Sequence, residues 1–270
     1  MQSTRKKVGL ALGSGGIRGM VHVGVIQTLM KHDIPIDYIA GSSIGAWVGA
    51  HYALFGDVEK LAEDTIGKRK EKLRALFEPS FRGGLVRGNK VERLLTVFFQ
   101  DKSFSDLRLP LSVVATDLTE GRQVVFTEGK LAPIVRASMA VPTIFRPVTY
   151  DGRLLVDGGV TNPVPDDVVR GMGADVVISV NLNNLPAVVE LGKRDLTLTN
   201  ITTRSIEIMR HTLARYSLVS SDIVIEPYIS YSGLSSWRRY FTQEIGHLIM
   251  KIGVEETERL MPRIKELLKN

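Results

Sequence analysis

The sequence predicts an α/β fold in which a mainly parallel sheet carries helices on both faces. Short apolar runs of strand length alternate along the chain with longer segments whose apolar residues recur at helical spacing. Glycine-rich turns follow several of the apolar runs, as they do where a strand passes into a helix. The chain has 270 residues, of which 44% are hydrophobic, and this is enough for one large core. We therefore expect a single domain over residues 1–270.

The chain opens with two strand-to-helix units. Residues 8–12 predict a short buried strand, and the apolar spacing of residues 17–32 predicts a helix. Residues 36–40 predict a second strand, followed over 44–56 by a helix that is apolar almost all round and therefore central. Because a helix that crosses between neighbouring strands makes them parallel, we expect the first two strands to be parallel neighbours.

The next region has the composition of an insertion between sheet elements. Residues 57–77 predict a charged helix, and a loop rich in glycine, proline and serine then leads to a helix that Asn89 would cap. The densest basic run, residues 67–74, contains a glutamate and no aromatic residue. We expect a solvated helix face there, and no nucleic-acid site.

The sheet is expected to resume after residue 110. Residues 111–116 and 123–127 predict strands joined by a turn, and residues 130–139 predict a helix. Asp151-Gly152 lies between two β-prone runs and predicts a hairpin whose second strand ends at Asp157. The remaining expected elements are strands at 174–180 and 223–225 and helices at about 203–216 and 244–268.

Composition excludes several classes of protein. The chain has no cysteine, so it contains neither disulfides nor thiolate metal sites, which fits a reducing compartment. The apolar stretch near the N-terminus is too short for a signal peptide, and no run reaches the roughly 18 apolar residues of a membrane span. We therefore expect a soluble, cytoplasmic protein. The net charge of +6 leaves contact with an anionic membrane open.

A serine stands between two glycines where the second predicted strand gives way to a helix. The segment GSSIG fits the G-x-S-x-G pattern, with Gly41, Ser43 and Gly45 at its fixed positions. A turn this sharp strains the serine backbone, and side chains in place of the glycines would collide with a neighbouring strand or helix. The hydroxyl then lies at a helix N-terminus, which favours negative charge. This context indicates a nucleophile for acyl transfer; the alternative is a serine that only caps the helix.

A second glycine-rich turn, Gly13–Gly19, follows the first strand and opens the first helix. Two observations argue against a dinucleotide-binding site. The glycine spacing is one residue longer than the dinucleotide-binding fingerprint, and the second strand does not end in the acidic residue that binds the ribose in such sites. In an acyl-transfer site, the loop would direct backbone N–H groups at the oxyanion, each contributing about 2.7–4 kcal/mol. Arg18 either adds positive charge there or braces the loop.

A serine nucleophile also needs a base. The five histidines all fall within or at the end of predicted helices, so we do not expect a Ser–His–Asp triad. Asp157, followed by Gly158 and Gly159, is the better candidate, because a partly desolvated carboxylate within reach of Ser43 can accept its proton. The alternative is an ordinary turn aspartate.

With these motifs in this order, the sequence resembles the patatin-like phospholipase family, in particular its short bacterial members. The likeness runs from about residue 8 to about 182 and less clearly through 183–270, the C-terminal strand and helices. It implies a three-layer α/β/α fold with a mainly parallel central sheet, and ester hydrolysis by a Ser–Asp dyad without histidine, metal or other cofactor. The segments that carry it are GSGGIRG at 13–19, GSSIG at 41–45 and DGG at 157–159, supported by VVATDLTEGRQVVF at 113–126 and ASMAVPTIFRPV at 137–148.

The resemblance also assigns roles to individual residues. Ser43 and Asp157 become the catalytic residues. The oxyanion hole falls on Gly13, Ser14, Gly15, Gly16 and Ile17, with Gly15 and Gly16 as the main donors, and the supporting residues are Arg18, Gly19, Gly41, Gly45, Gly158 and Gly159. Ser14 departs from the family, which often has glycine there, but its backbone N–H remains, so we expect the hole to persist.

The implied substrate is an acyl ester, namely a phospholipid or lysophospholipid. A soluble carboxylesterase or thioesterase with the same dyad is one alternative, and a non-catalytic nucleotide- or lipid-binding protein is another. Residues 78–88 and 232–241 place apolar and aromatic side chains beside arginines, as in a lid at a membrane surface. Peripheral contact with an anionic inner membrane surface therefore stays open.

Overall fold

The computed structural model describes residues 5–67, 78, 84, 86–184, 196–229 and 243–269. Its centre is an eight-stranded sheet in the order β5-β6-β3-β2-β1-β7-β8, with β4 also paired to β3. Strands β1, β2, β3, β7 and β8 run parallel to one another, whereas β4 and β6 run antiparallel to β3. The strands are β1 Val8–Leu12, β2 Tyr38–Ser42, β3 Leu111–Asp117, β4 Arg122–Phe126, β5 Val148–Tyr150, β6 Arg153–Asp157, β7 Val176–Val180 and β8 Ile223–Ile225.

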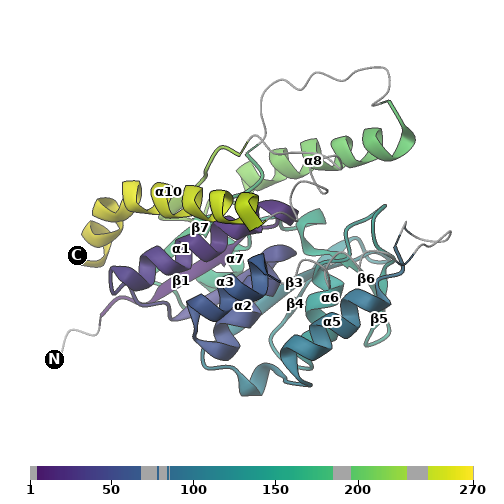
Figure 1. Ribbon diagram of the computed structural model, residues 1–270, viewed down its shortest axis with the longest axis horizontal. Helices are drawn as coiled ribbons and strands as arrows, with labels where there is room; N and C mark the ends of the chain where they lie inside the picture. Colours follow the sequence, from purple (N-terminus) through teal and green to yellow (C-terminus); the bar gives the residue numbers. More distant parts are fainter. Residues whose placement is uncertain are drawn as a thin grey trace.

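Helices cover both faces of this sheet, so the fold is a three-layer α/β/α arrangement with a mainly parallel sheet (Figure 1). None of the helices in the described ranges is long and apolar enough to cross a lipid bilayer. The helices are η1 Gly16–Gly19, α1 Met20–Lys31, α2 Ile44–Phe55, α3 Val58–Ile66, α5 Asn89–Phe99, η2 Phe104–Asp106, α6 Leu131–Ser138, η3 Gly158–Val160, α7 Asp166–Gly171, α8 Leu198–Tyr216 and α10 Gln243–Lys269.

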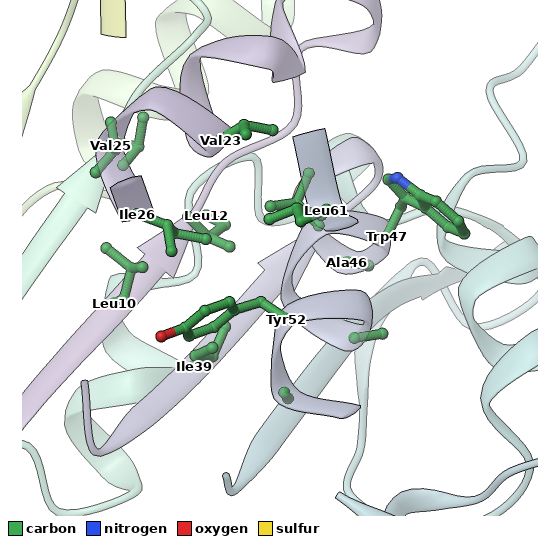
Figure 2. Packing of buried hydrophobic residues seen from close by; sticks show 14 of the residues in the cluster. Leu10, Leu12, Val23, Val25, Ile26, Ile39, Ala46, Trp47, Tyr52 and Leu61 are labelled. Carbon is green, nitrogen blue, oxygen red and sulfur yellow. The ribbon is translucent and has the colours of Figure 1, made fainter. Parts of the chain in front are cut away.

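One face of the sheet carries the larger hydrophobic core. Side chains alternate between the two faces of a strand, so Leu10 and Leu12 of β1 point to the same side as Ile39 of β2. Figure 2 shows these three packed beneath buried side chains of α1 and α2. Helix α10 lies across α1 on the outside of this layer (Figure 1).

The opposite face is lined by small side chains, which let α7 approach closely. Ala11 of β1 and Ala40 of β2 belong to a separate buried cluster with Val169 of α7. A Cβ atom added at Gly9 would lie 2.6 Å from the Cβ atom of Ala174 and 2.7 Å from a methyl of Val169. Close packing against α7 and Ala174 therefore explains why β1 has a glycine at position 9.

The predicted order of elements is confirmed, and the differences are local. The second strand lies two residues later than expected. The prediction that Asn89 caps a helix is wrong, because Asn89 is the first residue of α5 and the N-cap is Gly88, whose φ of 87° suits glycine. Helix α7 was not expected. The predicted charged helix is described only as α3, because residues 68–77 lie outside the described residues.

The hairpin of β5 and β6 follows its predicted turn. Asp151 and Gly152 have φ values of 51° and 72°, the two positive values that a type I′ turn requires. Tyr150 pairs with Arg153 across the turn. Strand β6 then runs back toward the centre of the sheet and ends at Asp157.

Strand β3 brings together the two strands that carry the candidate catalytic residues. Ser42, the last residue of β2, pairs with Val114, and Asp157, the last residue of β6, pairs with the next residue, Ala115. Strand β4 occupies the other edge of β3 over residues 113–117. Strands β2 and β6 therefore share one edge of β3 and meet there end to end.

Candidate active site

Ser43 occupies a strained turn between β2 and α2. Its φ and ψ are 57° and −121°, a conformation that costs a residue other than glycine of the order of 1–3 kcal/mol. The neighbouring glycines leave no room for side chains: a Cβ atom would lie 2.0 Å from the Leu12 carbonyl oxygen at Gly45, and 2.5 Å from the Gly45 carbonyl oxygen at Gly41. Close packing around the turn thus holds the serine at the first turn of α2.

The Ser43 hydroxyl donates a hydrogen bond to the carboxylate of Asp157. The distance from Oγ to Oδ2 is 2.5 Å, and the other carboxylate oxygen accepts the backbone N–H of Gly159 at 2.8 Å. Asp157 is 0% exposed. Its backbone is also fixed, because its N–H donates to the Ala140 carbonyl at 3.0 Å and its carbonyl accepts the Thr116 hydroxyl at 3.0 Å.

The surroundings of Asp157 change its basicity. Burial raises the pKa of its carboxyl group, because the charged form loses hydration. The positive charge of Arg210 and the hydrogen bonds from Ser43 and Gly159 lower that pKa but do not cancel the effect of burial. The result is a carboxylate that accepts a proton more readily than an exposed aspartate does.

A second serine fixes the backbone of the first. The Ser43 N–H donates to Oγ of Ser138 at 2.9 Å, and this hydroxyl donates to the Val114 carbonyl at 2.6 Å. Ser138 is the last residue of α6 and is completely buried. The segment 137–148 drew attention as part of the family resemblance, but nothing in the sequence indicated that Ser138 holds the turn.

The glycine loop lies directly against the serine turn. A Cβ atom at Gly19 would lie 2.1 Å from a side-chain carbon of Ile44, the first residue of α2. A Cβ atom at Gly159 would lie 2.6 Å from Ser14 Oγ, so the loop also borders the Asp157 segment. The serine, the aspartate and the glycine loop thus meet at the carboxyl ends of β1, β2 and β6, the edge where ligands bind in such sheets.

The backbone N–H groups of this loop divide into two sets. The N–H of Gly13 donates to the Val180 carbonyl at 3.1 Å and that of Ser14 to the Pro163 carbonyl at 2.7 Å, so both are occupied. Among the described residues, no backbone carbonyl accepts a hydrogen bond from the N–H of Gly15, Gly16 or Ile17. In the described structure, these three N–H groups are therefore unpaired, as the predicted oxyanion hole requires of its donors.

Two buried side chains, His22 and Arg18, form hydrogen bonds with backbone carbonyls of the glycine loop. His22 is completely buried, and its Nε2–H donates to the Gly13 carbonyl at 2.8 Å. Burial lowers the pKa of His22 to about 4, so the ring is neutral near pH 7. Arg18 donates from Nε to the Gly15 carbonyl at 3.2 Å, and burial lowers its pKa to about 10.

Helix α8 is tied to the same loop. The Nδ1 of His211 lies 2.6 Å from the Asn183 carbonyl oxygen, and the amide of Asn183 donates to the Ser14 carbonyl at 3.0 Å. Helix α8 also packs against η3, which directly follows Asp157. Sequence reasoning missed the roles of Asn183 and Arg210, because nothing in the local pattern places them at the site.

None of the described histidines forms a hydrogen bond with Ser43 or Asp157. In the described ranges there is no group of three or more histidine, aspartate or glutamate side chains that could hold a metal ion. Among the described residues, the one side chain that forms a hydrogen bond with the Ser43 hydroxyl is that of Asp157. The histidine contacts are His22 with Gly13, His32 with Glu258, His51 with Asp64 and His211 with Asn183, while His247 is exposed.

Comparison with known proteins agrees with this arrangement. The family model of patatin-like phospholipases matches residues 10–169. An uncharacterised NTE family protein of Mycobacterium tuberculosis is 39% identical over 186 residues, which is 68% of this chain and 51% of that protein. Human patatin-like phospholipase domain-containing protein 6 is 35% identical over 191 residues, 67% of this chain and 14% of that protein. The chain thus spans about half the length, or less, of these relatives.

A solved structure shares the fold. The crystal structure of VipD from Legionella pneumophila superposes with a TM-score of 0.65 at 15% identity, covering 96% of this chain and 67% of that one. At this identity the likeness concerns the fold alone.

The family model covers more than half of the chain and includes the glycine loop, the serine turn and the aspartate hairpin. The chain belongs to the patatin-like phospholipase family.

Proposed function

We propose that this protein is a serine lipid acyl hydrolase in which Ser43 is the nucleophile and Asp157 the general base. The observation that carries the proposal is the 2.5 Å hydrogen bond from the strained Ser43 hydroxyl to the buried carboxylate. The proposed localisation is the cytoplasm, with peripheral contact at the inner membrane surface. The whole chain is proposed to be one domain, since β8 of the C-terminal part extends the same sheet.

In the first half of the reaction, Asp157 accepts the hydroxyl proton as Ser43 Oγ attacks the ester carbonyl. The negative charge that develops on the carbonyl oxygen is stabilised by the free N–H groups of Gly15, Gly16 and Ile17. The carbon–oxygen bond to the alcohol then breaks, and the protonated Asp157 gives its proton to the departing alkoxide. The acyl group remains on Ser43.

In the second half, a water molecule takes the place of the alcohol. Asp157 accepts a proton from this water as its oxygen attacks the acyl carbon, and the same N–H groups stabilise the second oxyanion. The bond to Ser43 Oγ breaks, the serine recovers its proton from Asp157, and a fatty acid leaves. The raised pKa of Asp157 supports this role, because a stronger base is a better proton acceptor in both steps.

The proposed substrates are phospholipids or lysophospholipids, and family membership supports this class. A soluble carboxylesterase or thioesterase would use the same residues. The two activities separate in one comparison: a lipid hydrolase cleaves long-chain acyl esters in liposomes faster than short nitrophenyl esters or thioesters in solution, and an esterase shows the opposite order.

The outer side of α8 supports contact with a membrane surface. Apolar residues at helical spacing form an exposed stripe, in which Leu198 is 83% and Tyr216 is 75% exposed. None of the exposed α8 residues that the structure describes is acidic, and Arg215 supplies a positive charge. Helix α8 packs beside Asp157 on its inner side, so a bilayer against the stripe would lie next to the site. The stripe consists of Leu198, Ile201, Ile208, Met209 and Tyr216.

Binding to vesicles tests this surface. We expect Met209→Asp to weaken cosedimentation with phosphatidylglycerol vesicles, because it places a carboxylate in the apolar stripe. The control is Val97→Asp on α5, which replaces another strongly exposed apolar residue at 69% exposure. Equal loss of binding in both variants, or a change in oligomeric state alone, contradicts membrane contact through α8.

Labelling with a fluorophosphonate tests the nucleophile. We expect wild-type protein and Ser42→Ala to be labelled and to hydrolyse esters, whereas Ser43→Ala does neither. Ser42 is the matched control, because it is adjacent and buried and its hydroxyl has no hydrogen-bond partner among the described residues. Asp157→Asn should lower kcat/KM by about 10²–10⁴-fold. A non-catalytic nucleotide- or lipid-binding protein would not be labelled in any form.

A further inference from the structure

The unpaired N–H of Gly15 belongs to a planar peptide unit whose other end is the Ser14 carbonyl. In a trans peptide unit the carbonyl and the N–H of the next residue lie in one plane and point in opposite directions. A hydrogen bond that holds the Ser14 carbonyl therefore also sets the direction of the Gly15 N–H. This N–H has no backbone acceptor among the described residues and is one of the proposed oxyanion donors.

The side chain of Asn183 holds the Ser14 carbonyl. Its Nδ2 donates to this oxygen at 3.0 Å and lies 3.4 Å from Ser14 Oγ. Asn183 is 2% exposed, so the bond is shielded from solvent. Because a carbonyl oxygen only accepts hydrogen bonds, it is the amide nitrogen, and not the amide oxygen, that faces the loop.

The backbone of Asn183 is itself fixed on both sides. Its N–H donates to Oδ1 of Asn181 at 2.9 Å, and its carbonyl accepts from Nδ1 of His211 at 2.6 Å. Asn181 is anchored in turn, because its Nδ2 donates to Glu226 at 2.6 Å. The donor that meets the Ser14 carbonyl therefore comes from a segment that β7 and α8 hold in place.

The same segment packs against the Gly15 backbone. A Cβ atom at Gly15 would lie 2.5 Å from the Cβ atom of Leu182, the residue before Asn183. Leu182 is 1% exposed. One side of the Gly15 peptide is thus covered by an apolar side chain, while the amide of the next residue holds the adjoining carbonyl.

The direction of an oxyanion donor determines what it contributes. A donor stabilises the transition state only when it points at the place where the charge develops, and it does so most when it is aligned before the substrate arrives. Gly15 has no side chain to restrict its backbone, so an external contact must supply this alignment. An interaction of this kind acts on the transition state and not on the bound ester.

We propose that Asn183 is a positioning residue for the oxyanion hole and acts through the Ser14–Gly15 peptide unit. The proposal rests on the hydrolase function proposed above and adds a residue to it. In the described structure Asn183 forms no hydrogen bond with Ser43 or Asp157, so its effect passes through the loop. Asn183 lies outside residues 10–169, so the match to the family model assigns it no role.

The division of the effect between kcat and KM is the first test. Asn183→Leu keeps nearly the same size but cannot donate. Removing one oxyanion donor lowers kcat by about 10²–10³-fold. In this variant the donor is present but no longer held, so we expect kcat for a short nitrophenyl ester to fall about 10- to 100-fold, with KM nearly unchanged.

Ser179→Ala is the matched control. Ser179 lies on β7, is completely buried, and shares a hydrogen bond of 2.7 Å with Ser221. Its loss removes a buried side-chain hydrogen bond from the same strand without touching the loop, so kcat should stay near the wild-type value. An unchanged kcat in Asn183→Leu, or an equal fall in both variants, overturns the positioning role.

Inhibition by a long-chain trifluoromethyl ketone is the second test. Ser43 Oγ adds to the ketone carbon, its proton passes to Asp157, and the ketone oxygen becomes an oxyanion in the same hole. We expect the inhibition constant in Asn183→Leu to rise by the factor by which kcat/KM falls, as for a transition-state analogue. Asn183→Ala, which adds no bulk, gives the same comparison should Asn183→Leu not fold. An inhibition constant that does not change in a folded variant overturns the proposal.

The two proposals fail in different ways. A wild-type protein that neither hydrolyses esters nor reacts with a fluorophosphonate contradicts the hydrolase function and, with it, the positioning role. Ser43-dependent hydrolysis that has the same kcat and the same inhibition constant in wild type and in Asn183→Leu contradicts the positioning role alone.

Discussion

Acid should destabilise this protein through His22, the buried histidine that holds the glycine loop. Burial depresses the pKa of His22 from 6.5 to about 4 in the folded protein. A group with a depressed pKa contributes stability above its unfolded pKa, and that stability is lost as the pH falls toward its folded pKa. The substitution His22→Gln removes the titration and keeps an amide that can donate to the Gly13 carbonyl.

The size of the effect follows from the two pKa values. They differ by about 2.5, and each pKa unit corresponds to about 1.4 kcal/mol, so about 3 kcal/mol of unfolding free energy is lost between pH 7.5 and pH 4. About 1.4 kcal/mol of this loss is expected by pH 5.5. Other carboxyl and histidine groups titrate in both proteins, so they cancel in the difference between wild type and variant.

Urea unfolding followed by circular dichroism measures that difference. We expect the advantage of wild type over His22→Gln to shrink by about 3 kcal/mol from pH 7.5 to pH 4. A difference that stays constant over this range would show that His22 is protonated as easily in the folded chain as in the unfolded one. The conclusion that the buried His22 ring is neutral in the folded protein would then be wrong.

Three further predictions concern Asp157 and the serine turn. The kcat/KM for a short nitrophenyl ester should rise with pH through the raised pKa of Asp157, because only the ionised carboxylate accepts a proton; an acid limb at the value of an ordinary aspartate, 3.8, contradicts this. The raised pKa also affects stability: as the pH rises through the folded pKa of Asp157, the buried carboxylate ionises and wild type loses stability. Asp157→Asn does not ionise, so its melting temperature relative to wild type should increase from acid to neutral pH. Gly45→Ala should lower the unfolding free energy in urea by about 1–3 kcal/mol or more, while Gly171→Ala, which has open space around it, should be neutral or stabilising by up to about 1 kcal/mol; similar losses in both would refute the packing argument.

The sequence was most informative where local chemistry determines local structure. The strand at Val8–Leu12, the hairpin turn at Asp151-Gly152 and the serine turn at Gly41–Gly45 each follow from residue types within a few positions. The alternation of such strands with helices predicted the mainly parallel sheet with helices on both faces, and the family resemblance implied the three-layer form. Whether Ser43 and Asp157 catalyse a reaction stays a prediction.

Features that depend on distant segments could not be predicted. The N–H groups of Gly13 and Ser14 are occupied because β7 and Pro163 happen to lie beside the loop, and the loop sequence carries no sign of either. Arg210 is one of three arginines in α8, and nothing in the helix sequence indicates that its charge acts on the carboxyl group of Asp157. Asn89 is of a residue type that often caps helices, but Gly88, one residue earlier, is the N-cap and adopts a left-handed conformation, so α5 already begins at Asn89.

The two segments expected to form a lid lie largely outside the described residues. Residues 232–241, whose aromatic and basic side chains suggested a lid, lie outside the described residues, as do 79–83 and 85 of the other such segment. The exposed stripe of α8 was not expected from sequence, because its mixture of leucine, isoleucine, threonine and arginine gives no clear inward face until the helix is placed.

The end-to-end meeting of β2 and β6 on β3 makes the distance between serine and aspartate a property of strand register. Sliding β6 by one residue along β3 would move its last residue by about 3.4 Å and turn that side chain to the other face of the sheet. Changes in the length of the loops between β4 and β5 leave this geometry intact, because the ladder itself fixes it. The spacing of the serine and the aspartate therefore tolerates changes in those loops, provided that the seven-residue strand β3 keeps β2 and β6 in register.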